Sequence, residues 1–337
     1  MTSPAAPVPD RPAWLAVDGL QEAVLSVFDV ERIARALAEV GGYRLQPLPD
    51  ADRAQFAAWQ VPSTCTRIEQ ALLVPEPGGP APGCLRLVRF DGVAQQRVMR
   101  SSQRSWDTGG IFDVDVYARD VDSSYRALQR HGWTAFGEPV EYREAEFHVR
   151  QVVAVGPDGL VLAIIQRFSP PVPALDADPA LRMTPVFNST QMVRDFERAA
   201  RFSEQVLGWR KSHDFLVDAV AEPGADVLGL PLPQAITARR RVGIFHPADA
   251  QDGSIELIEN ASMYGRDCAA DCVAPNVGLL ALRFRVADAA GYAREILARG
   301  GELHGAPARF EVAPYGSVTT FAVRSPEGAI VEFIQPG

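Results

Sequence analysis

The sequence predicts an α+β protein built from four copies of one unit, a strand and a helix followed by three more strands. The first observation is an internal repeat, which is best sought before any other pattern. The segment YRALQRHGWTAFGEPVEY aligns with AREILARGGELHGAPARF, and VVAVGPDGLVLAIIQR aligns with FAVRSPEGAIVEFIQP. These segments make residues 111–167 similar to residues 279–336. The second observation is that two-residue alternation and helical periodicity follow each other in the same order in each copy.

Four units fit the chain, at 17–95, 108–170, 181–262 and 276–337. The Pro-rich segment 171–180 predicts a linker. We therefore expect an N-terminal domain at 17–170 and a C-terminal domain at 181–337. Residues 1–16 are also rich in proline and predict a flexible arm.

Alternating strands open and close each unit. FDVDVYARDVD and LALRFRVADAA are two of the opening strands, and their alternation predicts one buried face. A glycine turn and a further strand close the later units, in GPDGLVLAIIQR, QDGSIELIEN and SPEGAIVEFIQPG. Two of these closing strands carry a carboxylate at an inward-facing position, Glu256 and Glu332. The remaining one has Ala163 there.

Helices follow the opening strands. In RDFERAARFSEQVLGW, apolar residues at spacings of three and four form a stripe that can pack on a sheet, and Gly208 ends the helix. DVERIARALAEVGGY has the same pattern. An aspartate stands near each helix start, where its side chain can cap free backbone N–H groups. These aspartates are Asp29, Asp120, Asp195 and Asp288.

Composition excludes several functions. A net charge of −9 opposes general binding to nucleic acids or anionic membranes. No apolar run is long enough to span a membrane, and the N-terminus does not resemble a signal peptide, so a cytoplasmic location is expected. Cys268 and Cys272 lack the further ligands of a zinc site, so a plain loop is expected there. Phosphate-binding glycine loops and serine-hydrolase elbows are missing from the sequence.

The four units together resemble the vicinal oxygen chelate superfamily, which includes glyoxalase I, bleomycin-resistance proteins and extradiol dioxygenases. The segments that carry the resemblance are LSVFDVERIARAL, VFNSTQMVRDFERAARFSEQVLGW, GSIELIE and SPEGAIVEFIQ. The resemblance covers nearly the whole chain. It implies that units pair into two cupped mixed sheets, with the second cup as the catalytic or ligand-binding half.

The resemblance also implies where metal ligands would stand, usually a histidine on the first strand and a glutamate on the last strand of a unit. Here the first-strand positions, seven residues before each helix-start aspartate, are Glu22, Asp113, Asn188 and Ala281. The last-strand positions are Arg86, Ala163, Glu256 and Glu332. Because no histidine occupies these positions, we expect no iron triad. An ion pair between Glu22 and Arg86 would replace a metal in the first cup, and no cofactor is expected.

Glu256 and Glu332 are predicted to converge in the second cup as catalytic acid or base, with His246 as a further catalytic candidate. The predicted substrate-binding residues are Asn188, Tyr315 and Tyr264. A metal alternative remains, in which Asn188, Glu256 and Glu332 bind Mg²⁺, Mn²⁺ or Fe. His131 and His304 are expected to have structural or solvent-facing roles, on turns after helices. Nothing in the sequence singles out His213, and the apolar neighbours of His148 on its strand allow an interior or cavity position.

Three functions remain open at this point. The first is an enzyme that acts on a small organic, aromatic or oxygenated, substrate by acid/base chemistry of the isomerase or lyase type, without a histidine–metal triad. The second is a non-catalytic protein that binds a drug or metabolite in an apolar cup. The third is a metal-dependent enzyme related to glyoxalases or dioxygenases, with atypical ligands. A monomer or homodimer is expected in each case, with no nucleic-acid or membrane partner.

Overall fold

The computed structural model describes residues 19–76, 82–144, 146–217, 226–237, 239–247, 253–261 and 263–337. The expected arm at 1–16 lies outside these residues. The elements of the first unit are β1 (Leu20–Ser26), α1 (Val30–Gly41), β2 (Tyr43–Pro47), α2 (Arg53–Ala58), β3 (Arg67–Pro75) and β4 (Cys84–Asp91). The second unit has β5 (Asp113–Tyr117), α3 (Val121–Arg130), β6 (Thr134–Ala135), β7 (Val140–Glu144), β8 (Phe147–Val155), the 3₁₀ turn η1 (Pro157–Gly159) and β9 (Val161–Ser169).

After α4 (Pro173–Ala177), the third and fourth units repeat the pattern. The third has β10 (Asn188–Met192), α5 (Phe196–Arg201), the π-helical turn η2 (Phe202–Val206), β11 (Arg210–Val217), α6 (Leu232–Ala235), β12 (Arg240–His246) and β13 (Ser254–Asn260). A short turn, η3 (Ala269–Asp271), precedes the fourth unit. That unit has β14 (Gly278–Arg285), α7 (Ala289–Ala298), β15 (Leu303–Val312), β16 (Gly316–Arg324) and β17 (Ile330–Pro336). The predicted four-unit α+β architecture is confirmed.

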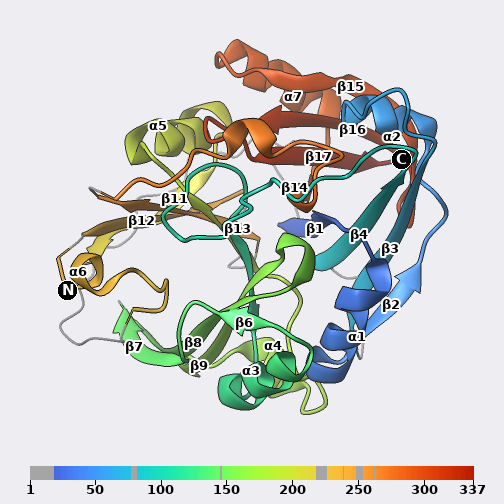
Figure 1. The fold of residues 1–337 in the computed structure, drawn as a ribbon. Helices are drawn as coiled ribbons and strands as arrows, with labels where there is room; N and C mark the ends of the chain where they lie inside the picture. The colour runs from blue at the N-terminus through green and yellow to red at the C-terminus, as the bar shows by residue number, and fades with distance from the viewer. Residues whose placement is uncertain are drawn as a thin grey trace.

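The strands form two mixed sheets (Figure 1). One, which we call sheet A, has the order β15-β16-β17-β14-β1-β4-β3-β2. The other, sheet B, has the order β11-β12-β13-β10-β5-β9-β8-β6, with β7 paired to β8. In each sheet the first strands of two units pair antiparallel at the centre, and each first strand pairs parallel with its own unit's last strand.

The pairing of the units corrects the predicted domain organisation. Sheet A combines the first and fourth units, and sheet B combines the second and third, so neither 17–170 nor 181–337 forms a cup by itself. In every unit of the repeat, one edge of the first strand is available to pair with another unit. The repeat does not specify which unit supplies the partner strand. Charge provides a physical reason for the observed choice. Pairing β1 with β14 sets Glu22 opposite Arg283, whereas pairing β1 with β5 would have brought Glu22 to Asp113 and Asp115.

Segment 171–180 is therefore not a linker between two domains. It contains α4, and it connects two units of the same sheet. Leu175 in this segment is buried, and the guanidinium of Arg119 donates hydrogen bonds to the carbonyls of Leu175 and Asp178. The segment packs on the second unit.

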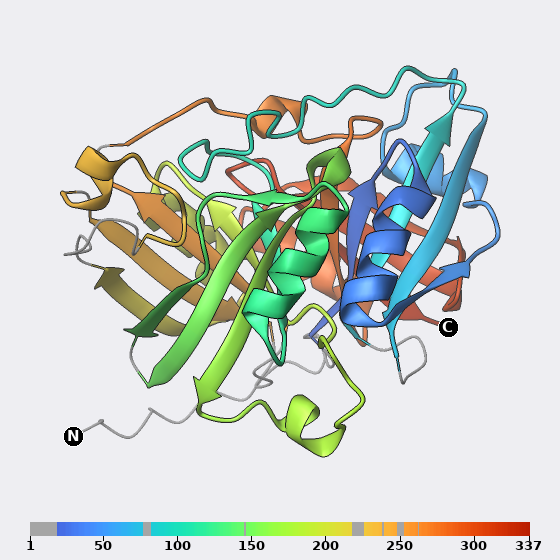
Figure 2. The same cartoon turned by 60° about the horizontal axis from the view of Figure 1, so that its bottom comes forward.

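The four helices that follow the first strands, α1, α3, α5 and α7, lie between the backs of the two sheets. Figure 2 shows α1 and α3 side by side, and in the other pair of units Trp209, between η2 and β11, donates from its Nε1 to the hydroxyl of Tyr292 on α7. One continuous apolar core joins these helices to the facing side chains of both sheets. The predicted caps are confirmed, because the carboxylates of Asp29, Asp120, Asp195 and Asp288 each accept a backbone N–H of the first helical turn.

Helix packing on one face leaves the opposite, concave face of each sheet for a site. Side chains alternate along a strand, so Val114 and Val116 enter the helix-side core while Asp113 and Asp115 face the hollow of sheet B. Among the described residues, no helix has the length and apolar character needed to cross a membrane.

Candidate functional site

Six positions on each concave face correspond between the two sheets. On each first strand, the two positions lie seven and five residues before the helix-capping aspartate. The position on each last strand is the residue that the strand register sets beside the second of these two. In sheet A these positions hold Glu22, Val24, Arg86, Ala281, Arg283 and Glu332; in sheet B the corresponding residues are Asp113, Asp115, Ala163, Asn188, Thr190 and Glu256. The same backbone frame thus presents two different sets of side chains.

In sheet A the set forms a buried ion-pair network, which we call the sheet A quartet: Glu22, Arg86, Arg283 and Glu332. Arg86 makes a two-pronged contact with Glu22, at 2.7 Å from Nε to Oε2 and 2.7 Å from Nη2 to Oε1. Arg283 joins both acids, at 2.6 Å from Nη1 to Glu22 Oε2 and 2.8 Å from Nη2 to Glu332 Oε2. The expected Glu22–Arg86 ion pair is confirmed, and it is part of a larger network.

The sheet A quartet balances its own charge, with two acids and two guanidiniums. Burial acts to raise the pKa of Glu22, but Arg86 and Arg283 outweigh this effect and lower it. Further donors complete the network. The hydroxyl of Tyr315 donates to Glu22 at 2.9 Å, and Thr320 donates to Glu332 at 3.2 Å. Glu22 is therefore held ionised as a structural partner of the two arginines, whose guanidiniums would repel a metal cation.

In sheet B the corresponding positions hold acids with no arginine among them. We call Asp113, Asp115 and Glu256 the sheet B acid cluster. Asp113 and Asp115 are 3% and 5% exposed, whereas Glu256 is only partly buried. Burial is the main cause that raises the pKa of Asp113, to about 6. Burial, followed by the charges of Asp113 and Glu256, raises the pKa of Asp115 well above its usual value.

Neutral side chains orient the sheet B acid cluster. Asn188 Nδ2 donates to Asp115 Oδ2 at 2.8 Å, and Asn188 Oδ1 accepts from the hydroxyl of Ser254 at 2.5 Å. The hydroxyl of Thr190 donates to Glu256 Oε2 at 3.1 Å. The Oδ1 atoms of Asp113 and Asp115 are buried and have no hydrogen-bond partner among the described residues. Such oxygens are costly to bury, and in native proteins they mark places that a ligand or proton can occupy.

Apolar side chains surround the sheet B acid cluster. Phe112, Ala163, Met192, Val242 and Ile258 belong to one buried group with Leu228 and Leu230 from the segment before α6, and Trp106, Phe136 and Phe215 pack at its border. The group combines aromatic and aliphatic surface with a few polar groups, as small-molecule sites do. The concave face of sheet B is therefore the candidate active site.

The predicted convergence of Glu256 and Glu332 is wrong. Glu256 lies in sheet B and Glu332 in sheet A, because the third and fourth units belong to different sheets. The alternative in which Asn188, Glu256 and Glu332 bind one metal ion is wrong for the same reason. In the part of the chain that the structure describes, no group of three histidine, cysteine or carboxylate side chains is arranged to hold a metal ion. The metal that the fold implies therefore does not fit these residues.

Other predicted site residues are distributed between the two cups. Tyr315 belongs to the sheet A quartet and not to the acid cluster. Tyr264 is half exposed, and its hydroxyl donates at 3.4 Å to Glu259, whose side chain leaves β13 on the face opposite to Glu256. His246 is buried on β12, two residues after Ile244, which stands opposite Glu256. Only His246 and Asn188 thus share the concave face with Glu256 among these candidates.

His213 also lies on the concave side of sheet B, on the edge strand β11 opposite Ile244, whereas the other remaining histidines and Cys268 and Cys272 lie away from the acid cluster. His131 contacts Glu39, His148 contacts Glu141, and the ring of His213 contacts the Ser212 hydroxyl. Burial and Arg324 lower the pKa of His304, which is on β15 of sheet A. Cys268 and Cys272 are buried in the apolar filling of the sheet A cup.

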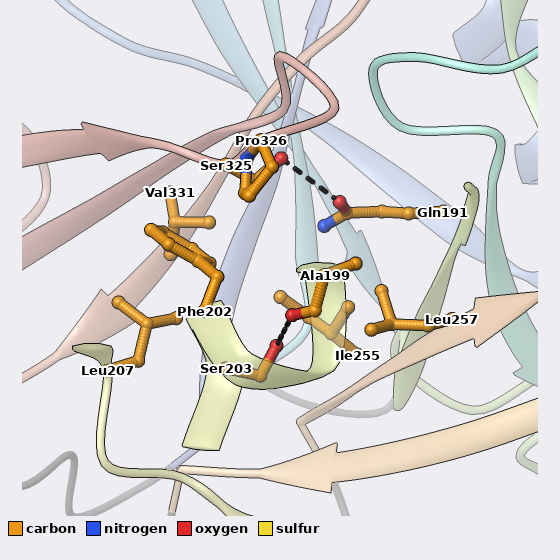
Figure 3. A pocket seen from close by; sticks show the side chains of 10 residues that line it. All are labelled: Gln191, Ala199, Phe202, Ser203, Leu207, Ile255, Leu257, Ser325, Pro326 and Val331. Carbon is orange, nitrogen blue, oxygen red and sulfur yellow. Dashed lines mark hydrogen bonds between the residues drawn. The ribbon is translucent and has the colours of Figure 1, made fainter. Parts of the chain in front are cut away.

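A small pocket lies on the helix side of the sheets (Figure 3). It is lined mainly by apolar groups from η2, β13 and β17, and Ser325 donates a hydrogen bond to Gln191 at 3.3 Å. Gln191 leaves β10 on the face opposite to Thr190, and Ile255 and Leu257 leave β13 opposite to Glu256. This pocket is therefore separate from the acid cluster.

Asp115, Arg283 and Thr190 were missed as site residues by sequence reasoning. Each stands two residues after a position that was identified, so each shares its neighbour's face. The signal was present in FDVDV, where two acids alternate with valines, and in LALRF, where one arginine interrupts an apolar strand. The strand register brings two positions of each first strand into the cup.

Comparison with known proteins agrees with the observed fold. No family model matches the chain, and no curated protein matches it in sequence. Among solved structures, glyoxalase I from Zea mays is similar, with a TM-score of 0.60 and 16% identity over 94% of this chain and 92% of that chain. A putative dioxygenase from Bacillus subtilis has a TM-score of 0.56 and 13% identity over 96% and 86%. The chain therefore has the same fold as these glyoxalase and dioxygenase structures.

Proposed function

We propose that this protein is an enzyme that moves a proton on a small organic substrate bound at the sheet B acid cluster. The observation that carries the proposal is the pair Asp113 and Asp115, two buried carboxyl groups whose pKa values are both raised. Adjacent carboxyl groups that cannot both ionise provide an acid and a base at the same pH. Perturbed groups of this kind gather at functional sites.

The mechanism follows from the sharing of one proton. The ionised carboxylate accepts a proton from a substrate carbon or heteroatom, and the protonated carboxyl group returns a proton to a neighbouring position of the same substrate. The substrate is isomerised and the pair ends with one proton, as it began. Such proton transfer contributes about 10²–10⁴-fold in rate. Asn188 holds Asp115 in place, and the apolar group around the cluster excludes water.

No step in this mechanism needs a metal ion. The sheet B acid cluster has only oxygen ligands and includes no histidine, and the sheet A quartet is occupied by guanidiniums. His246 is a further candidate for contact with the substrate, because it shares the concave face with Glu256. The catalytic role predicted for Glu332 is not proposed, because Arg283 neutralises that carboxylate.

The test is solvent deuterium incorporation. The protein is incubated in D₂O with a panel of small aromatic and aliphatic carbonyl, hydroxy and amino compounds, and exchange is followed by NMR and mass spectrometry. We expect one class of compound to incorporate deuterium with the wild-type protein. The Asp115→Asn variant should reduce this rate by about 100-fold or more.

The matched control is Glu259→Gln, which neutralises an acid on β13 whose side chain leaves the other face of the strand. It should keep the wild-type exchange rate. An exchange rate that is the same in Asp115→Asn as in the wild type, or a panel without any exchange, would contradict the proposal. Binding of panel compounds without exchange would favour a binding protein.

A further inference from the structure

Arg240 places a positive charge at one end of the sheet B cup, on the same face as the candidate active site. It stands on β12, two residues before Val242, which belongs to the apolar group around the acid cluster, and four before Ile244, which pairs with Glu256. Alternation therefore puts the Arg240 side chain on the concave face. The next residue, Arg241, points to the helix side of the sheet, where its guanidinium lies over an aromatic ring of α5.

The Arg240 guanidinium is only partly used. Its Nη1 donates to Oδ1 of Asp226 at 2.5 Å, and this is its only hydrogen bond to a described residue. Arg86, Arg283 and Arg241 instead each set two nitrogen atoms on one carboxylate. A guanidinium has five N–H donors in a fork that fits both oxygens of a carboxylate. Arg240, whose side chain is 13% exposed, thus keeps donors for a further oxygen acceptor.

The partner of Arg240 comes from a covering segment and not from the sheet itself. Asp226 begins segment 226–237, which contains α6 and contributes Leu228 and Leu230 to the apolar group around the acid cluster. Oδ2 of Asp226 accepts the backbone N–H of Leu230 at 2.6 Å, so this carboxylate is tied to its own segment. Its other oxygen contacts Arg240 with a single prong, as one oxygen of a ligand carboxylate could do.

A second polar group beside Arg240 is also incomplete. Asn260 of β13 pairs with Arg240 in the strand register, and it is buried on the same face. Its Nδ2 donates to the carbonyl of Ser105 at 3.2 Å, which fixes the orientation of the amide. Its Oδ1 has no donor in the part of the chain that the structure describes. A buried acceptor of this kind marks a place for a ligand atom or a water molecule.

We propose that this end of the sheet B cup binds the carboxylate of a small organic acid, which Arg240 holds with two N–H groups and for which Asp226 is an internal stand-in. The ligand replaces Asp226 at Arg240, and segment 226–237 moves aside with its aspartate as the ligand enters. This names the substrate class of the site in the proposed function, and it rests on that proposal for the catalytic role only. The carboxylate binding follows from Arg240, Asp226 and Asn260.

The length of the cup suits an acid with an apolar body. A strand rises about 3.3 Å per residue, so Arg240 stands about 13 Å along β12 from Ile244, at the level of Glu256. Val242 and Ile258 lie between these two levels. With its carboxylate at Arg240, a ligand places its body against these side chains and its far end near the acid cluster. The apolar stretch also separates the negative charge of the ligand from the acids.

The experiment measures binding of 3-phenylpropanoate and 4-phenylbutanoate to the full chain by calorimetry at pH 8. The alcohol 3-phenylpropanol and the amine 3-phenylpropylamine have the same kind of body with a neutral and a cationic end. We expect at least one of the two acids to bind at least tenfold more tightly than the alcohol. The amine should bind no more tightly than the alcohol.

The variant Asp226→Asn separates an internal stand-in from a structural anchor. Asparagine keeps an oxygen for the N–H of Leu230 but offers Arg240 no negative charge. Because the internal competitor is removed, the acids should bind at least threefold more tightly than they bind to the wild type. If Asp226 only anchors its segment, the same change leaves the affinity equal or lower.

A second pair of variants locates the carboxylate. Arg240→Met is made together with Asp226→Asn, so that no buried carboxylate loses its cation, and it should weaken acid binding at least tenfold relative to Asp226→Asn alone. Arg241→Met in the same Asp226→Asn background removes a guanidinium from the helix side of β12 and should not change the affinity. If the Arg240→Met protein does not fold, the effect of Asp226→Asn and the comparison of acid with alcohol still decide.

Several results would overturn this inference: equal affinity for the acids and the alcohol, equal or weaker binding of the acids in Asp226→Asn, or equal affinity in the Arg240→Met and Arg241→Met proteins. Failure here is distinguishable from failure of the proposed function. Deuterium exchange that depends on Asp115, without a preference for acids, removes the inference and keeps acid/base catalysis. Acid binding that depends on Arg240, without exchange, keeps the inference and removes the catalysis.

Discussion

At the scale of single residues, Asp113 and Asp115 show how a site can reduce stability. Asp113 ionises near pH 6 in the folded protein, against an ordinary value of 3.8. Between these pH values the folded state holds more protons than the unfolded state, so stability falls as pH rises through this window. Glu22 behaves oppositely, because its lowered pKa gives stability that is lost as pH falls through its folded-state pKa. The two cups thus respond to pH with opposite signs.

Replacing Asp113 by Asn should therefore stabilise the protein at pH 8, by about 2 kcal/mol, and the gain should disappear below pH 4. The measurement is urea unfolding of the wild type and the variant across this pH range. Asp122→Asn is the control. Arg150 lowers the pKa of the Asp122 carboxyl group, so replacing this carboxylate should give no increase in the free energy of unfolding at pH 8. An Asp113→Asn variant less stable than the wild type at pH 8 would show that the ionised carboxylate has a partner.

At the scale of elements, the pairing of β1 with β14 depends on Arg283. Arg283→Met leaves Glu332 buried without its cation, and breaking a buried pair in this way costs about 3–5 kcal/mol. Urea unfolding at pH 7 measures the loss. Arg283→Met combined with Glu332→Gln should recover most of it, and Arg285→Met, at an exposed position of β14, should change stability little. A loss below about 1 kcal/mol in Arg283→Met would mean that the network does not hold the sheet together.

The elements also show what the sequence could and could not predict. Helix caps at Asp29, Asp120, Asp195 and Asp288 follow from local chemistry, so they were predictable, and so was the contact between Glu22 and Arg86 within one unit. The meeting of Glu22 with Arg283 joins residues 261 positions apart. Alternation fixes which face a side chain takes, but it does not fix which strand lies alongside. The predicted meeting of Glu256 with Glu332 failed for that reason.

At the scale of the whole molecule, each sheet combines one unit from the N-terminal half of the chain with one unit from the C-terminal half. The first and last units share sheet A, while the two middle units share sheet B, and one apolar core joins the helices behind both sheets. A cup thus forms only when both halves of the chain are present. The acid cluster combines β5 of the second unit with β10 and β13 of the third. The candidate active site therefore contains residues from both sides of segment 171–180.

This arrangement predicts the behaviour of the two halves when they are made separately, as residues 1–180 and 181–337. Each half would expose the edges of two first strands, and joining β1 to β5 within the N-terminal half would bring Glu22 towards Asp113 and Asp115 without Arg283 to balance them. We expect neither half to unfold cooperatively alone, and the two to co-purify as a complex when expressed together, as size-exclusion chromatography and thermal unfolding would show. A stable, monomeric N-terminal half would instead mean that the units pair equally well in either order, and that the Glu22–Arg283 contact does not select the fold.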